Sequence, residues 1–219
     1  MIQILNQQNS ILNNFIQEIR DKNIQKDSMR FRTNIERIGQ IMAFELSKTL
    51  HYKAIDIETP LGIASENVVA EKIVIASILR AGLPLHNGLL SVFDKAENAF
   101  VSAYRKYIDK VSFDINVEYI SAPNIKDKTL ILCDPMLATG GSMELSYKAL
   151  LSHGEPKSIH IVSIIASKQA IEHIQKTMPM DKTTLWIAAV DEKLNEHAYI
   201  VPGIGDAGDL AFGEKIDKK

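Results

Sequence analysis

Residues 129–142 (TLILCDPMLATGGS) combine the residue types that bind a phosphate monoester. An apolar run ends at Asp134, and the small turn 138–142 (ATGGS) follows. Glycines let backbone N–H groups approach an anion, the hydroxyls of Thr139 and Ser142 add donors, and the N-terminus of a following helix supplies positive dipole. Asp134 is suited to hold a pair of ribose hydroxyls or a water bound to Mg²⁺. The spacing of a Walker A loop is absent, and a plain turn with a capping serine is an equally good interpretation.

Arg80 is a second candidate for anion binding. It follows directly on an apolar run and precedes small residues, in the segment 75–85 (IASILRAGLPL). A guanidinium at the end of a buried strand can grip a diphosphate through two parallel hydrogen bonds. An ion pair with a structural carboxylate is an equally good interpretation. Arg105 and Lys106 could bind the same anion, although an ordinary surface charge run is the simpler interpretation of that pair.

The third candidate segment, 191–213 (DEKLNEHAYIVPGIGDAGDLAFG), contains a literal G-x-G-x-x-G match at 203–208. Only 11 residues follow Gly208, too few for the helix, second strand and distal acid of a dinucleotide-binding unit. We therefore interpret these glycines as shaping an irregular loop. Its backbone amides and carbonyls are fixed donors and acceptors, which suit recognition of a small planar base. The alternative is a glycine-rich loop without function.

Metal and nucleophile patterns do not emerge from the spacing of cysteine and histidine. Cys133 is the single cysteine, which excludes an internal disulfide and a multi-cysteine zinc site. The 6 histidines form no H-x-x-x-H or H-E-x-x-H pair, so each is expected to be a single hydrogen-bonded side chain. Cys133 and Trp186 both lie in apolar runs and are expected in the core.

Composition bounds the remaining functions. The chain has 219 residues, of which 46% are hydrophobic and 24% charged, as is typical of one globular domain. The 25 Lys and Arg against 27 Asp and Glu leave no global basic field for nucleic acid or a membrane. No apolar run approaches the roughly 20 residues that span a bilayer, and the first residues lack the layout of a signal peptide. We therefore expect a cytoplasmic enzyme.

The elements that must position the candidate residues follow from the apolar pattern. Nearly continuous apolar runs predict strands buried on both faces, at residues 72–79, 99–104, 129–133, 158–165 and 183–190. Helical spacing predicts helices at residues 35–50, 142–151 and 167–178. Thr33 or Asn34 is the expected N-cap of the first helix, and Pro179 follows the last. This alternation predicts an α/β fold with a mainly parallel sheet.

Two further segments complete the expected organisation of a single domain over residues 1–219. Residues 103–121 alternate too strongly for a central strand and predict a β-ribbon with one solvated face, serving as a flap. Residues 214–219 are expected to form a solvated tail.

Together these segments resemble the uracil phosphoribosyltransferases, within the type I phosphoribosyltransferase superfamily. The resemblance rests on residues 78–82 (ILRAG), Tyr104 with Arg105, residues 134–142 (DPMLATGGS) and residues 194–209 (LNEHAYIVPGIGDAGD), in family order between about 28 and 213. It implies a parallel central sheet flanked by helices, an N-terminal extension at 1–27, the flap at 103–121 and a C-terminal base-binding hood at 191–213. It also implies pyrimidine salvage: uracil and 5-phosphoribosyl 1-diphosphate (PRPP) give UMP and diphosphate.

The resemblance also implies a role for each matching residue. Arg80, Arg105 and Asp206 are the expected catalytic residues, the two arginines as ligands of the diphosphate. The expected PRPP site adds Asp134, Pro135, Met136, Leu137, Ala138, Thr139, Gly140, Gly141 and Ser142. The expected uracil site is formed by Tyr199, Ile200, Gly205, Asp206 and Ala207. Mg²⁺ is the expected cofactor, bound mainly through PRPP, so no protein metal ligands are expected.

The resemblance further implies a homodimer or larger homo-oligomer, with GTP as a candidate effector. From the charge balance, neither nucleic acid nor a membrane is expected as a partner. The sequence departs from the family pattern at Pro84, at Lys106 with Tyr107, at Ala198, and at Leu210 with Ala211. Three alternatives stay open: a regulator of this fold that binds pyrimidine-operon RNA, a transferase for another base such as a purine, and a silent relative that only binds.

Overall fold

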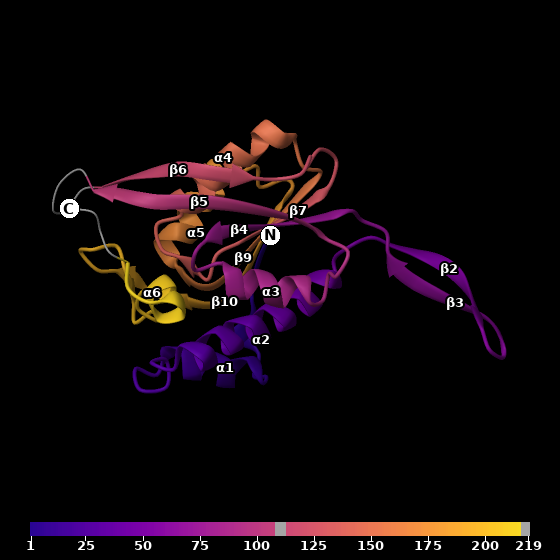
Figure 1. Cartoon of the computed structure of the whole chain (residues 1–219), viewed down its shortest axis with the longest axis horizontal. Coiled ribbons are helices and arrows are strands. Elements are labelled where there is room, and N and C mark those ends of the chain that lie inside the picture. The colour runs from indigo at the N-terminus through magenta and orange to yellow at the C-terminus, as the bar shows by residue number, and fades with distance from the viewer. Residues whose placement is uncertain (108–112, 216–219) are drawn as a thin grey trace.

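The computed structural model describes the backbone of residues 1–107 and 113–215, and the side chains of these residues outside 103–118. Within this part, one large sheet has the strand order β1-β10-β9-β7-β4-β5-β6 (Figure 1). The strands are β1 (Ile2–Ile4), β4 (Ile73–Leu79), β5 (Glu97–Tyr107), β6 (Phe113–Ser121), β7 (Thr129–Cys133), β9 (Ser158–Ser167) and β10 (Thr183–Asp191), and the short β8 (Met136–Leu137) also pairs with β9. All neighbours are parallel except β5 and β6. The predicted α/β fold is thus confirmed.

Helices cover both faces of this sheet, as Figure 1 shows. The helices are α1 (Leu12–Arg20), α2 (Ser28–Ser47), α3 (Leu83–Leu90), α4 (Gly141–Leu150), α5 (Lys168–Thr177) and α6 (Ala207–Phe212). Successive strand residues point to opposite faces, so Ile75 packs with α1, α2 and α3 while Val74 packs with α4 and α5. This double coverage is why the strands are apolar nearly throughout.

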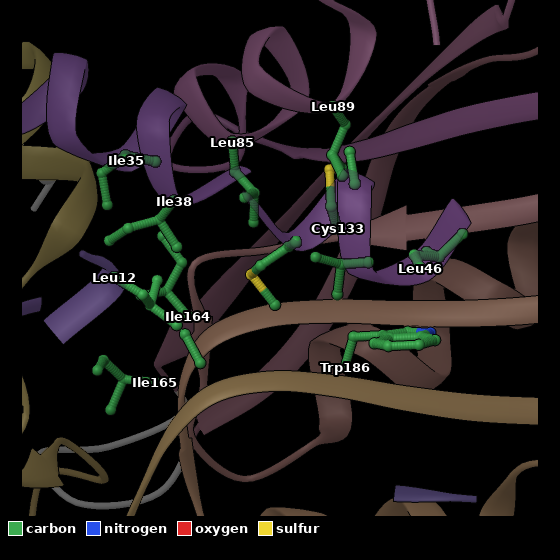
Figure 2. Packing of buried hydrophobic residues seen from close by; sticks show 14 of the residues in the cluster. Leu12, Ile35, Ile38, Leu46, Leu85, Leu89, Cys133, Ile164, Ile165 and Trp186 are labelled. Carbon is green, nitrogen blue, oxygen red and sulfur yellow. The ribbon is translucent and has the colours of Figure 1, made fainter. Parts of the chain in front are cut away.

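The core between the sheet and the first three helices buries the two residues singled out in the sequence. Cys133 and Trp186 are both buried in the same cluster as Leu46 and Leu85 (Figure 2). The thiol of Cys133 is fully buried, and this burial, with the nearby charge of Asp134, raises its pKa. Cys133 is therefore a core residue rather than a reactive thiol, as predicted.

The expected N-cap of the first predicted helix is wrong. Helix α2 begins at Ser28 and is capped by Asp27, whose carboxylate accepts a hydrogen bond of 3.0 Å from the backbone N–H of Arg30. Asn34 lies inside the helix and is buried, because its amide donates to Glu18 of α1 at 2.6 Å. A polar residue that looks like a cap thus bridges two helices instead.

A hairpin that the apolar pattern did not predict projects from the domain (Figure 1). Strands β2 (Tyr52–Thr59) and β3 (Gly62–Val69) pair with each other and form a separate two-stranded sheet. The side chains of Leu61 and Ile63 at its tip are 100% and 79% exposed. Because the hairpin contributes almost nothing to the core, its residues carry little of the patterning that reveals a buried strand.

The ribbon expected at 103–121 agrees with the backbone pairing where it is described. Strands β5 and β6 pair antiparallel from Phe100 opposite Ser121 to Tyr107 opposite Phe113, with an irregularity after Ser102. Residues 108–112 lie outside the described part of the chain. The use of this ribbon as a flap stays a prediction.

His160 in strand β9 makes stability depend on pH. Its Nδ1 accepts a hydrogen bond of 3.0 Å from the indole N–H of Trp186, and burial lowers its pKa to about 4. The unfolded chain, with a histidine pKa of about 6.5, binds more protons than the folded chain between these values. The free energy of unfolding should therefore fall as the pH drops from about 6.5 to about 4, by roughly 3 kcal/mol in total.

Denaturant unfolding at neutral pH and at about pH 4.5 measures this loss. The control is His160→Gln, which retains an acceptor for Trp186 but does not titrate in this range. The decline should be smaller in the variant. An equal decline in both proteins would assign the pH dependence to other groups.

Candidate functional site

The candidate residues gather at one edge of the sheet because its central strands run parallel. Strands β5, β4, β7, β9 and β10 are consecutive neighbours that point the same way. Arg80 follows β4, Asp134 follows β7, and the C-terminal segment follows β10. Ligands of open α/β sheets bind outside the carboxyl ends of the strands. The fold therefore places the three candidate segments where such a site is expected.

The loop after β7 is fixed to the neighbouring strand along its first half. Asp134 accepts a hydrogen bond of 3.1 Å from the backbone N–H of Met136. Met136 and Leu137 then pair with β9 as strand β8. Ser167 donates to the carbonyl oxygen of Ala138 at 2.6 Å. These contacts hold the backbone of the loop in place before helix α4 begins.

Gly140 forms the transition from this loop into helix α4. Its φ of +87° lies in the left-handed region, and a Cβ there would lie 2.8 Å from Cδ2 of His173. Thr139 Oγ1 accepts a long hydrogen bond of 3.4 Å from the N–H of Gly141. The backbone N–H groups of the first helical turn are otherwise the natural ligands of an anion. Only glycine satisfies both the conformation and the space at this position.

The acidic residue in the first turn of α4, Glu144, is held by two neighbouring side chains. Glu144 contacts Lys148 at 2.6 Å and Nε2 of His173 at 2.7 Å. The hydrogen bond from Lys148, and then that from His173, hold the pKa of Glu144 below its usual value. Its negative charge is thus paired with two side chains, one of which, His173, lies against Gly140.

Arg80 links the β4 loop to the C-terminal helix. Its Nη2 donates to Asp209 Oδ1 and to the carbonyl oxygen of Gly213, each at 3.2 Å, and the side chain is 40% exposed. The structure is thus compatible with both interpretations from the sequence. Arg80 has a structural carboxylate partner, Asp209, and its guanidinium is also exposed enough to bind a diphosphate. Pro84, one of the departures from the family pattern, sits in the first turn of α3, where proline is tolerated.

The C-terminal segment forms a compact loop before α6. Strands β11 (Lys193–Leu194) and β12 (Ile200–Val201) pair in it, and Ile200 buries its side chain. Asp206 caps α6 by accepting from the N–H of Asp209 at 3.0 Å. Lys215 Nζ lies 3.5 Å from Asp206 and 4.0 Å from Asp209. Arg80 and Lys215 therefore balance two carboxylates at this end of the site.

The remaining predicted base contacts lie on the surface of this segment or just beneath it. Tyr199 is 36% exposed, and its backbone exchanges hydrogen bonds of 2.9 Å with Asn195. Gly205 is exposed with a φ of +82°, and Ala207 is buried as the first residue of α6. Ala198, which replaces a common glycine of the family, has a φ of +58°. That conformation explains why glycine is favoured there.

One predicted catalytic side chain is not described. Arg105 lies in β5, with its backbone opposite Ile115. Its side chain falls outside the described part of the chain. Its role in binding diphosphate stays a prediction. Among the residues that the structure describes, no group of three or more His, Cys, Asp and Glu side chains could hold a metal ion.

Sequence reasoning missed the contacts that hold the C-terminal segment against the N-terminal helices. Arg20 at the end of α1 pairs with Asp191 at the end of β10, and both contact Gly203. Arg32 of α2 donates to the carbonyl oxygen of Ala211 and lies over the ring of Phe212. Asp191 does resemble Asp134 in ending an apolar run, but Arg20 carries no comparable signal.

Comparisons with known proteins agree with this arrangement. A family model described as uracil phosphoribosyltransferase matches residues 6–214. A uracil phosphoribosyltransferase of Porphyromonas gingivalis is 59% identical over 212 residues, covering 97% of this chain and 98% of that protein. One of Thermococcus gammatolerans is 40% identical over 202 residues, covering 91% and 88%. A solved protein of Aquifex aeolicus has a TM-score of 0.86 and 28% identity, covering 97% and 98%.

Gly140→Ala should weaken the binding of PRPP at least about tenfold. The new methyl group would meet the His173 ring, and the left-handed backbone disfavours alanine, so the loop has to move. Isothermal titration with PRPP measures the loss. Gly62→Ala in the hairpin is the control: its φ of +158° also disfavours alanine, but a Cβ there meets nothing within 4 Å.

The double variant Gly140→Ala with His173→Ala separates the two causes. It removes the contact but keeps the unfavourable backbone conformation, so part of the affinity should return. Full wild-type affinity in a folded Gly140→Ala protein would show that this loop does not bind PRPP.

Proposed function

The chain belongs to the uracil phosphoribosyltransferase family, and from this membership we propose that it converts uracil and PRPP to UMP and diphosphate. The observation that supports this most is the contact between Arg80 and Asp209. It joins the loop suited to diphosphate with the segment suited to a base, although the two residues are 129 positions apart. The loop 134–142 follows β7, the strand that pairs with β4, and so lies at the same edge of the sheet as Arg80.

The reaction exchanges two bonds at the anomeric carbon of the ribose. The bond to diphosphate breaks, a bond to a ring nitrogen of uracil forms, and that nitrogen loses its proton. Positive charge develops on the ribose, and negative charge develops on the leaving diphosphate. Catalysis then comes mainly from holding both substrates in line and from stabilising the departing diphosphate. Arg80 and Arg105 are proposed for the second task.

The loop 134–142 is proposed to hold the 5-phosphate through backbone N–H groups at the start of α4 and through the hydroxyls of Thr139 and Ser142. Asp134 is proposed to hold the ribose hydroxyls. The backbone of Ile200 and of residues 205–207 is proposed to bind uracil, with Tyr199 beside it. Asp206 is proposed to contact PRPP.

The carboxylates at this edge fit the proposed cofactor, Mg²⁺ carried by PRPP. Asp134 is suited to hold a water bound to this Mg²⁺, so the ion needs no direct protein ligand. Mg²⁺ bound to PRPP neutralises negative charge on the diphosphate. The ribbon 103–121 is proposed to cover the site and exclude water, which would otherwise hydrolyse PRPP.

A regulator that binds RNA is not favoured, because relatives matched over nearly the whole chain are named uracil phosphoribosyltransferase. In the part of the chain that is described, no helix is long and apolar enough to cross a bilayer. We propose a cytoplasmic location, which suits the free thiol of Cys133. GTP as an effector is proposed on the family resemblance alone.

A competition assay tests the reaction. The purified protein receives PRPP, Mg²⁺ and equal amounts of uracil, adenine, guanine, hypoxanthine and orotate, and mass spectrometry identifies the nucleotides. UMP should be the product. Arg80→Ala should lower turnover by about 10²-fold or more while changing stability by less than about 1 kcal/mol, because the Arg80 ion pair is half-exposed.

A different nucleotide would require reassignment of the base loop. Loss of activity matched by equal loss of stability in Arg80→Ala would assign Arg80 a structural role. No nucleotide at all, from protein that binds PRPP, would contradict the proposed reaction.

We also propose a homo-oligomer that covers the projecting hairpin. An isolated two-stranded hairpin is marginally stable in water, and exposed apolar groups such as Leu61 and Ile63 mark surfaces that associate. Light scattering should show a dimer or larger for the wild type and a smaller mass for Leu61→Lys with Ile63→Lys. Asn67→Lys, at an exposed polar position of the same hairpin, is the control. A monomeric wild type, or an unchanged mass in the double variant, would contradict this assignment.

A further inference from the structure

Arg20 and Asp191 form an ion pair between the N-terminal helices and the end of the sheet. Nη1 of Arg20 donates to Asp191 Oδ2 and Nη2 donates to Oδ1, each at 2.8 Å. The side chain of Asp191 is only 7% exposed, and that of Arg20 is 23% exposed. Two parallel hydrogen bonds fix both the distance and the orientation of the two groups. The ion pair therefore holds α1 and the end of β10 in a fixed relative position, unlike a loose surface contact.

The same two side chains hold Gly203 from both sides. Arg20 Nη1 donates to the carbonyl oxygen of Gly203 at 3.0 Å, and Asp191 Oδ2 accepts from the N–H of Gly203 at 2.9 Å. Gly203 has a φ of +57°, and a Cβ there would lie 2.2 Å from the carbonyl oxygen of Ile200. The backbone N–H and C=O of Gly203 are thus both engaged, so the peptide units on either side of its Cα are held in orientation.

Gly203 lies between the two parts of the segment that we assign to uracil, Ile200 and residues 205–207. Recognition by backbone groups depends on the position of the backbone itself, because no side chain can adjust to restore a lost hydrogen bond. The buried side chains of Ile200 and Ile204 fix the depth of the loop. Apolar packing is non-directional, however, and does not set the direction of N–H and C=O groups. The hydrogen bonds of Arg20 and Asp191 with the backbone of Gly203 do set that direction.

We propose that Arg20 and Asp191 are positioning residues for base recognition, which orient the backbone of residues 200–207 toward uracil without contacting it. The proposal rests on the proposed function. It also gives the N-terminal extension 1–27 a role, since Arg20 ends helix α1. Arg32 of α2 donates a hydrogen bond to the carbonyl oxygen of Ala211 near the end of α6. The two N-terminal helices therefore contact the C-terminal segment at two places, Gly203 and Ala211.

The test measures KM for uracil and for PRPP separately in the double variant Arg20→Leu with Asp191→Asn. This variant removes the ion pair without leaving a buried charge unpaired, which would threaten folding. KM for uracil should rise about tenfold while KM for PRPP and kcat change less than about threefold, because only binding of the base is lost. Arg20→Lys, which keeps the charge but loses the two parallel bonds, should fall in between.

The matched control is Arg30→Leu, which breaks the ion pair between Arg30 and Glu18 that also links α1 and α2. It should leave both KM values within about twofold of the wild type. Hydrogen exchange gives a readout that does not depend on activity. Residues 192–206 should exchange faster in the double variant and at the wild-type rate in the control, with residues 134–142 unchanged in both.

The possible outcomes distinguish the positioning role of Arg20 and Asp191 from the proposed uracil phosphoribosyltransferase reaction on which it rests. If the wild type makes UMP and the folded double variant has an unchanged KM for uracil, the positioning role is wrong and the function stands. An equal rise of both KM values would also overturn it, since general loosening then explains the loss. A wild type that makes no UMP overturns the proposed function and base recognition with it. Unchanged hydrogen exchange of residues 192–206 in the double variant would show that the Arg20–Asp191 pair does not hold this backbone in place.

Discussion

Parallel pairing of five neighbouring strands is the constraint on which the site depends. Strands β5, β4, β7, β9 and β10 all point to one edge, so loops from distant parts of the sequence meet there. Parallel strands need crossover connections, and the helices here cover both faces and bury most residues of these strands. The stable core and the assembly of the site are therefore consequences of the same topology.

At that edge, the loop after β7 and the C-terminal segment are held in place by different interactions. The loop after β7 relies on a left-handed glycine and a helix N-terminus, and β9 holds it through main-chain pairing. The C-terminal segment has only two short strands of its own. Side chains from α1 and α2 supply the rigidity that it lacks, through Arg20 and Arg32. Charged groups on the first two helices thus contribute to a site that they do not line.

The sequence predicts those features that leave a local pattern. Buried strands leave apolar runs, and the phosphate-type loop leaves glycines and hydroxyls next to Asp134, so the five central strands and helices α4 and α5 were predicted closely. The hairpin β2–β3 leaves no pattern of a buried strand because most of its side chains are exposed and none is fully buried. Pairs that join residues more than 100 positions apart, such as Arg20 with Asp191, leave no local pattern at all. Asn34 shows the opposite error, since a residue typical of caps bridges two helices.

A crystal structure with bound UMP tests the central claim most directly, because one molecule has to span both halves of the site. The account predicts its phosphate at the N–H groups of residues 138–142 and its base against the backbone of residues 200–207. A phosphate bound elsewhere would contradict the assignment of the β7 loop. A base that lies away from the C-terminal segment would contradict uracil recognition by that backbone, and with it the role of the N-terminal helices.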